Sequence, residues 1–170
     1  MRSGVVVFAV GNRSRGDDAI GPLLLEHLAP WLAAEVPAGE FELIDDYQLQ
    51  IEHALDLRGR RLALFIDAGC DTPAPFQFYP VGPVPAAAAG MTHRLAPQGV
   101  LDVYRQFEGV APPPAFVLCV RGERFDLGEG LSDAATLHAE AAWQHLNLLC
   151  RQPYAAIWQD LTSISGLGAA

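Results

Sequence analysis

The amino-acid sequence predicts an α/β fold of three layers, α/β/α, in which helices cover both faces of a mostly parallel, twisted sheet of about five strands. Two features of the chain support this fold class. Short, almost entirely apolar runs alternate with longer segments in which apolar residues recur every three or four positions. Continuous apolar runs are typical of strands that are buried on both faces, and helices cover such strands in parallel sheets.

The first half of the chain is predicted to contain three strands and two helices. In chain order these are the strand Val5–Val10, the helix Ile20–Leu32, the strand Phe41–Ile44, the short helix Leu49–Leu57 and the strand Leu62–Ala68. The last of these strands carries a carboxylate, Asp67, near its end. Because ligands bind outside the carboxyl ends of parallel strands, Asp67 is a candidate site residue.

An edge strand and a connection begin the second half. Prolines surround Gln77–Val81 and cannot donate ladder hydrogen bonds, so this run is predicted to lie at the margin of the sheet. The proline- and alanine-rich stretch Pro83–Gly90 is then expected to be a flexible connection.

Two helices and a strand complete the predicted domain. They are the helix Pro97–Phe107, the strand Ala115–Val120 and the helix Asp133–Cys150, for which Ser132 is a suitable N-cap. In the helix Pro97–Phe107, one apolar face is expected to contain Val100, Leu101, Tyr104 and Phe107.

The length of 170 residues and a hydrophobic content of 51% suit a single domain with a substantial core, which we assign to residues 1–152. Residues 153–170 are expected to form a tail. Ile157, Trp158 and Leu161 fall at helical spacing there, but the chain ends in glycine and alanine, so the tail is expected to dock only in part.

Charge and cysteine content narrow the class of partner and the compartment. The formal net charge of −9 argues against nucleic acid or an anionic membrane surface and favours a metal ion or a basic protein segment. No apolar run is long enough to span a bilayer, and the N-terminus does not have the pattern of a signal peptide. Three widely spaced cysteines fit reduced thiols, so we expect a cytoplasmic protein.

The loop after the first strand is acidic where nucleotide-binding loops are not. Gly11 and Gly16 have the spacing of a phosphate loop, but Asp17 and Asp18 stand where such a loop needs Lys and Ser or Thr. Two negative charges repel a phosphate, so this loop suits a cation. One of the two carboxylates can cap the following helix while the other points outward.

Three residues form a candidate metal site. Asp18 and Asp67 belong at the carboxyl edge of the sheet, and His93 lies in a polar loop directly before a predicted helix. Two oxygen ligands and one nitrogen ligand suit a first-row divalent metal and leave positions open for water or substrate. From the residues alone, an equally good account is that Asp18 caps a helix, Asp67 closes a turn and His93 is solvated.

The chain resembles the nickel–iron hydrogenase maturation proteases over nearly the whole domain. The resemblance rests on Gly11-Asn12 through Asp17-Asp18-Ala-Ile-Gly21, on Ile66-Asp67-Ala68, on Thr92-His93-Arg94-Leu95 and on Leu131-Ser132. In that family the second acid of the opening pair, the acid of the Asp-Ala pair and the loop histidine contact the metal. These positions are Asp18, Asp67 and His93 here, and Asp17 is then expected to be a helix cap.

The resemblance implies an endopeptidase that removes the C-terminal extension of a hydrogenase large-subunit precursor already loaded with nickel. The metal is then brought by the substrate, although other divalent metals could occupy the same ligands. A bound divalent ion lowers the pKa of water toward about 7, so no Ser–His or Cys–His dyad is needed. No H-E-x-x-H helix is present, which argues against an ordinary zinc protease.

One segment departs from the family. Many members have an Asp-Gly-Gly-like stretch after the second strand, whereas this chain has residues 45–52, Asp-Asp-Tyr-Gln-Leu-Gln-Ile-Glu. Asp46 and Gln48 are therefore candidate contacts to the precursor, with a local Asx-turn as the alternative for Asp46. Gln-Leu followed by Glu resembles the branch that serves soluble, cofactor-reducing hydrogenases. A monomer that binds its substrate transiently is expected.

Two other functions remain open at this stage. A non-catalytic nickel-binding chaperone of the large subunit would need the same ligands but would leave its partner whole. A small-molecule-binding domain of the same fold is also possible, because this fold supports many functions. The acidic opening loop argues against phosphorylated ligands for such a domain.

Overall fold

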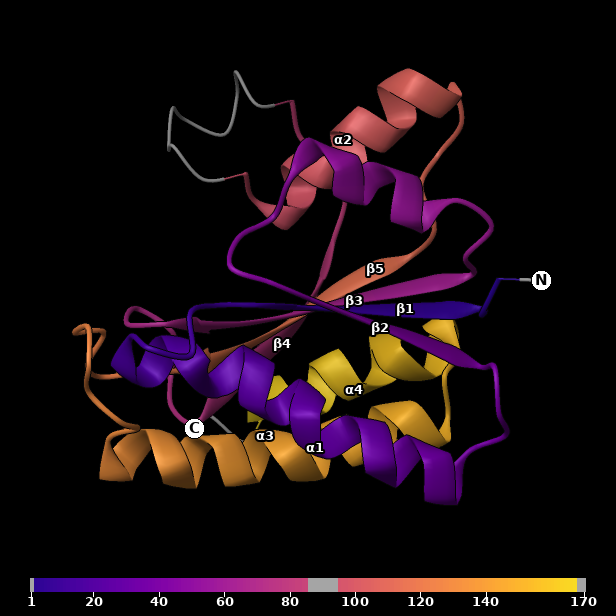
Figure 1. Cartoon of the computed structure of the whole chain (residues 1–170). Coiled ribbons are helices and arrows are strands. Elements are labelled where there is room, and N and C mark those ends of the chain that lie inside the picture. Colours follow the sequence, from indigo (N-terminus) through magenta and orange to yellow (C-terminus); the bar gives the residue numbers. More distant parts are fainter. Residues whose placement is uncertain (1, 86–94, 168–170) are drawn as a thin grey trace.

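The computed structural model confirms the three-layer α/β fold with a five-stranded, mostly parallel sheet (Figure 1). It describes residues 2–85 and 95–167. The strands are β1 (Val5–Val10), β2 (Phe41–Asp46), β3 (Leu62–Gly69), β4 (Phe76–Val81) and β5 (Ala115–Arg121). The helices are η1 (Gly16–Ala19), α1 (Ile20–Glu35), η2 (Ile51–Leu57), α2 (Pro97–Glu108), α3 (Asp133–Arg151) and α4 (Ala155–Leu167), with η1 and η2 of the 3₁₀ type.

The sheet has the strand order β2-β1-β3-β5-β4. The first four strands in this order pair in parallel, and β4 pairs antiparallel with β5 at the edge. The expected edge strand is therefore confirmed, and Pro80 lies within it where no further strand needs its missing N–H. The carboxyl ends of all four parallel strands consequently lie at one edge of the sheet.

Alternate residues of each strand pack on opposite faces, as the pleat requires. In β1, Val5 and Val7 belong to a core that includes residues of α1, α3 and α4, while Val6 and Phe8 belong to a second core under η2 and α2. Figure 1 shows the same division, with α1, α3 and α4 on one side of the sheet and α2 on the other. Both faces are covered, which explains why the strands are continuously apolar.

The segment after α3 packs as a helix. Trp158 of α4 is fully buried in the core on the α1 and α3 face, and its indole N–H donates a hydrogen bond to the carbonyl of Leu149 at 2.9 Å. An amphipathic aromatic that is both buried and hydrogen-bonded fixes the docking of this helix. No helix within residues 2–85 and 95–167 combines the length and apolar character that a bilayer crossing requires.

One histidine of α3 is buried against aromatic rings of β4. His145 of α3 is buried against the rings of Phe76 and Phe78, and its Nε2 has no hydrogen-bond partner within the described part of the chain. Burial lowers the pKa of His145 to about 4, because the charged imidazolium would lose its hydration there.

This buried histidine makes the fold sensitive to mild acid. Below its unfolded pKa of about 6.5, the unfolded chain takes up a proton that the folded chain binds only near pH 4, so stability falls across this window by about 3 kcal/mol. In urea unfolding between pH 7 and pH 4, His145→Leu is expected to show a shallower decline than the wild type. His27→Gln, which removes an exposed histidine from α1, serves as control. Equal declines in wild type and His145→Leu would contradict this role.

Candidate functional site

Asp17 is fully buried and ties the first loop to two distant segments. Its carboxylate accepts hydrogen bonds from the backbone N–H groups of Glu123, Arg124 and Ser132 at 2.7–2.9 Å, and from the Ser132 hydroxyl at 2.8 Å. Burial by itself raises the pKa of Asp17, but the hydrogen bonds from Arg124, Ser132 and Glu123 outweigh it, so the pKa lies below its ordinary value. Asp17 is therefore held as a carboxylate.

The expectation that Asp17 caps a helix of its own loop was wrong. Neither η1 nor α1 has a side-chain cap, and their N-cap residues are Arg15 and Ala19. Asp17 instead stabilises the start of α3. Ser132 donates to it and in turn accepts a hydrogen bond from the Ala135 N–H at 3.1 Å, which confirms Ser132 as the N-cap of α3.

Asp18 lies on η1 at the carboxyl edge of the sheet. The backbone N–H of Asn12 donates to its Oδ2 at 2.8 Å, so one carboxylate oxygen is fixed by the loop that ends β1. η1 contacts β3, and α1 begins directly against the strand ends, because a Cβ on Gly21 would lie 2.9 Å from the Val10 carbonyl oxygen and 3.2 Å from that of Ile66. Asp18 is thus held near the carboxyl ends of β1 and β3.

Gly11 makes this arrangement possible. Its φ is +151°, and a Cβ built on it would overlap the backbone carbonyl of Asp18. Glycine is required at such a position because the conformation and the close approach both exclude a side chain.

A Gly11→Ala variant is expected to lose at least about 2 kcal/mol of unfolding free energy, since the added carbon meets backbone that cannot move aside. Gly39→Ala is the matched control, because Gly39 also has a positive φ of +84° but a Cβ there would meet nothing within 4 Å. Urea unfolding of both variants measures the difference. Equal losses would mean that conformation alone, and not contact with Asp18, demands glycine.

Asp67 lies near the end of β3. Its Oδ1 accepts a hydrogen bond from the Ala68 N–H at 2.8 Å. Its register partner on β5 is Cys119, and the strand alternation turns both toward the α2 face. Burial raises the pKa of the Cys119 thiol and of the Tyr79 phenol, and the charge of Asp67 raises both further, against a lowering of the Cys119 pKa by its hydrogen bond with Thr72. Asp67 therefore faces a thiol and a phenol that stay neutral.

The third expected ligand, His93, lies outside the described residues. The described chain nearest to it in sequence lies on the α2 face of the sheet. Leu95 packs into the core on that face, and the Val84 N–H donates to the Gln98 carbonyl at 3.2 Å. This is the face on which the Asp67 side chain lies. Within residues 2–85 and 95–167, no group of three or more His, Cys, Asp or Glu side chains could hold a metal ion.

The candidate substrate contacts follow β2. Asp46 accepts a hydrogen bond from the adjacent Tyr47 N–H at 2.7 Å, and its Oδ2 lies 3.4 Å from Nε2 of the buried His53. His53 Nδ1 accepts from the Gln50 N–H at 2.8 Å. Asp46 is therefore held by a local turn and by a histidine that its position on a short helix did not suggest. Gln48 is exposed.

A polar pocket of about 340 Å³ lies beside Asp18, between the loop that follows β1 and the end of β2. Gly11–Ser14 and Asp45–Tyr47 line it. Arg13 crosses this pocket and forms ion pairs with Asp45 at 2.7 Å and Glu26 at 2.8 Å. Its walls combine two carboxylates, the Arg13 guanidinium and the polar side chains of Asn12, Ser14 and Tyr47, so the pocket suits a polar group.

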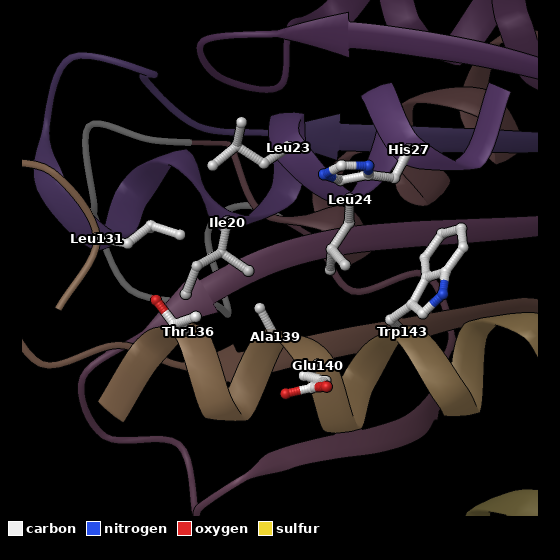
Figure 2. Close-up of a pocket in the computed structure, with 9 residues that line it drawn as sticks. All are labelled: Ile20, Leu23, Leu24, His27, Leu131, Thr136, Ala139, Glu140 and Trp143. Atoms are coloured by element: carbon white, nitrogen blue, oxygen red, sulfur yellow. The ribbon is translucent and has the colours of Figure 1, made fainter. Parts of the chain in front are cut away.

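A larger groove of about 450 Å³ lies on the opposite face, between α1 and α3 (Figure 2). Figure 2 shows Leu24 of α1 and Ala139 of α3 on facing sides of this space, with the His27 ring close to Trp143. Their ring centroids are 6.3 Å apart. Its walls are mainly apolar, although His27, Thr136 and Glu140 also line it, so this groove suits an apolar group better than a metal ion.

The chain folds as an open α/β domain, and the candidate site at the carboxyl edge of its sheet is acidic. Asp18 lies on η1, Asp46 ends β2 and Asp67 lies near the end of β3, and carboxylate oxygens are ligands for divalent cations.

No protein-family model and no curated protein matches the sequence. Solved structures do share its fold. The hydrogenase maturating endopeptidase HybD from E. coli matches with a TM-score of 0.67 at 23% identity, over 90% of this chain and 94% of that chain. The [NiFe] hydrogenase maturation protease HycI from Thermococcus kodakarensis KOD1 gives 0.65 at 20%, over 89% and 94%. The endopeptidase HycI from Escherichia coli gives 0.60 at 18%, over 88% and 91%.

Proposed function

We propose that this protein is an endopeptidase that removes the C-terminal extension of a nickel-loaded [NiFe]-hydrogenase large-subunit precursor. The observation that carries the proposal is the fold that the chain shares, over about nine-tenths of its length, with hydrogenase maturation endopeptidases. The opening loop supports it, because Asp18 lies at the sheet edge where the resemblance requires a metal-contacting carboxylate.

In this proposal Asp18, Asp67 and His93 hold the nickel that the precursor carries. The hydrogen bond from Asn12 holds Oδ2 of Asp18 and so orients the carboxylate that would be a ligand to the nickel. When bound, the nickel polarises the scissile carbonyl and lowers the pKa of a coordinated water toward about 7. Other divalent metals could use the same ligands.

Asp46 and Gln48 then contact the precursor beside this site. Asp46 lines the polar pocket next to Asp18, and the hydrogen bond from the Tyr47 N–H orients its carboxylate. The segment that contains them supports assignment to the branch that serves soluble, cofactor-reducing hydrogenases. The proposal further includes a monomeric, cytoplasmic enzyme with one domain, residues 1–152, and a tail, residues 153–170, that carries no site residue.

The test is to incubate the protein with nickel-loaded and nickel-free large-subunit precursor and to measure intact masses of the products. Mass loss only with nickel is the expected result. An unchanged mass in a stable, nickel-dependent complex would instead indicate a nickel-binding chaperone. If two different precursors are neither cut nor bound, the proposed function is wrong and a small-molecule-binding domain becomes the better account.

A further inference from the structure

An apolar groove of about 220 Å³ lies on the outer surface between η2 and α2. Its apolar walls are formed by Ile51, Ala54, Leu55, Val103, Tyr104 and Phe107. The proposed endopeptidase chemistry uses none of these side chains. Exposed apolar patches with a polar rim are typical of interaction sites, so this groove is a candidate binding site for a partner.

The exposed side chains in this groove are large. Phe107 is 68% exposed, Ile51 is 64% exposed and Leu55 is 45% exposed. The spacing of α2 predicts Phe107 on the same apolar face as Val100 and Leu101, and those two residues are indeed fully buried. Phe107 instead is exposed and lines the groove together with Val103 and Tyr104.

The ring of Phe107 is held in place. The guanidinium carbon of Arg58 lies 5.2 Å from the ring centroid, and Arg58 also forms an ion pair with Glu108. A cation over an aromatic face restricts the ring. An exposed aromatic that is already positioned loses little side-chain entropy when a partner covers it, which favours binding.

The rim of the groove is acidic. Glu52 and Glu108 both line it, Arg58 balances the charge of Glu108 so that Glu52 leaves the rim net negative, and the chain carries 20 acidic and 11 basic residues. Two copies of a protein with a net charge of −9 repel each other, so a second copy is a poor occupant. Apolar side chains flanked by Lys or Arg match both the walls and the rim.

The groove continues from the candidate site. Tyr47 is 72% exposed and lines the polar pocket beside Asp18, and η2 begins at Ile51, four residues later. The segment that lines the polar pocket beside Asp18 therefore leads directly into the wall of the groove.

We propose that the groove between η2 and α2 docks the folded body of the precursor through an amphipathic segment in which Lys or Arg flanks apolar residues. This inference rests on the proposed function for the identity of the partner. It adds a recognition surface outside the cleavage site, and such a surface supplies binding that does not depend on the bond that is cut.

The test uses the full chain with the double substitution Ile51→Gln and Phe107→Gln, and the nickel-loaded precursor as substrate. KM is expected to rise about tenfold or more while kcat stays within about twofold. The control is the pair Leu137→Gln and Leu148→Gln, two exposed leucines of α3 on the opposite face of the sheet. Glu52→Lys is expected to raise KM about threefold, since it reverses a charge on the rim. Circular dichroism and thermal unfolding establish that the variants fold.

Each outcome decides a separate point. Unchanged KM in the groove variant overturns the docking surface but leaves the endopeptidase intact. If the wild type binds the precursor without cutting it and the groove variant loses that binding, the surface stands and the proposed activity fails. If Glu52→Lys binds the precursor more tightly than the wild type does, the proposal that Lys or Arg flanks the docking segment is overturned. A wild-type dimer that the groove variant converts to a monomer overturns the proposal in favour of self-association, and a precursor that is neither bound nor cut overturns both proposals.

Discussion

An Asp67→Asn variant is expected to lose at least about a hundredfold in kcat/KM for nickel-loaded precursor while its fold is retained. An amide is a weaker ligand than a carboxylate for a divalent cation. The substitution preserves the shape of the side chain and a carbonyl oxygen, which can still accept the hydrogen bond from the Ala68 N–H. Intact-mass measurement of the cleaved precursor over time gives the rate.

Asp71→Asn is the matched control for this prediction. Asp71 is an exposed carboxylate in the turn directly after β3, so its substitution removes the same charge from the same neighbourhood. Its cleavage rate is expected to stay within about twofold of the wild type. Full activity in Asp67→Asn would remove Asp67 from the ligand set, and equal losses in both variants would point to local charge in place of coordination.

The sequence predicts the sheet well because its strands are buried on both faces. Each of β1, β3 and β5 is a run of apolar residues, and the expected ranges differ from the observed ones by at most one residue. The 3₁₀ geometry of η1 could not be foreseen. It depends on Asp17, whose hydrogen-bond partner Ser132 lies 115 residues away in the chain.

The candidate site is likewise predicted only in part from the sequence. The rule that parallel strands open at one edge places Asp18 and Asp67 there from sequence alone. Residue spacing does not show which groups orient a carboxylate, and so the contact of His53 with Asp46 was missed. Helical periodicity likewise identifies the apolar face of α2, of which Val100 and Leu101 are fully buried, but it does not reveal that Phe107 on the same face is exposed.

An Asp17→Ala variant is expected to lose about 4 kcal/mol of unfolding free energy at pH 7. The substitution leaves the buried Ser132 N–H and the partly buried N–H groups of Glu123 and Arg124 without their acceptor, and an unsatisfied buried donor costs about 1–3 kcal/mol. For a chain of this length the midpoint of thermal unfolding should fall by about 10 °C. Urea unfolding measures the free energy directly, and a loss below about 1 kcal/mol would mean that water replaces the carboxylate at this position.

The loss should depend on pH in a defined direction. Hydrogen bonds hold the pKa of Asp17 in the folded state below its ordinary value, so its stabilisation is complete above the unfolded pKa of about 3.9. It declines as pH falls through the lower, folded pKa, because the protonated group accepts these hydrogen bonds less well. The difference between wild type and Asp17→Ala should therefore be constant from pH 7 to about pH 5 and smaller near pH 3.

Asp18→Ala is the matched comparison, because it truncates the neighbouring carboxylate by the same atoms. Among residues 2–85 and 95–167, Asp18 accepts a hydrogen bond from Asn12 alone, so its loss should cost only about 1 kcal/mol. It should nevertheless abolish cleavage if Asp18 holds the precursor's nickel, whereas Asp17→Ala, assayed well below its lowered melting temperature, should retain activity. Adjacent residues of one acidic pair would then have separate roles: Asp17 fixes the loop against α3, and that fixed loop presents Asp18 at the sheet edge. If both variants lose activity and stability together, the pair acts as one structural unit and the ligand role of Asp18 is wrong.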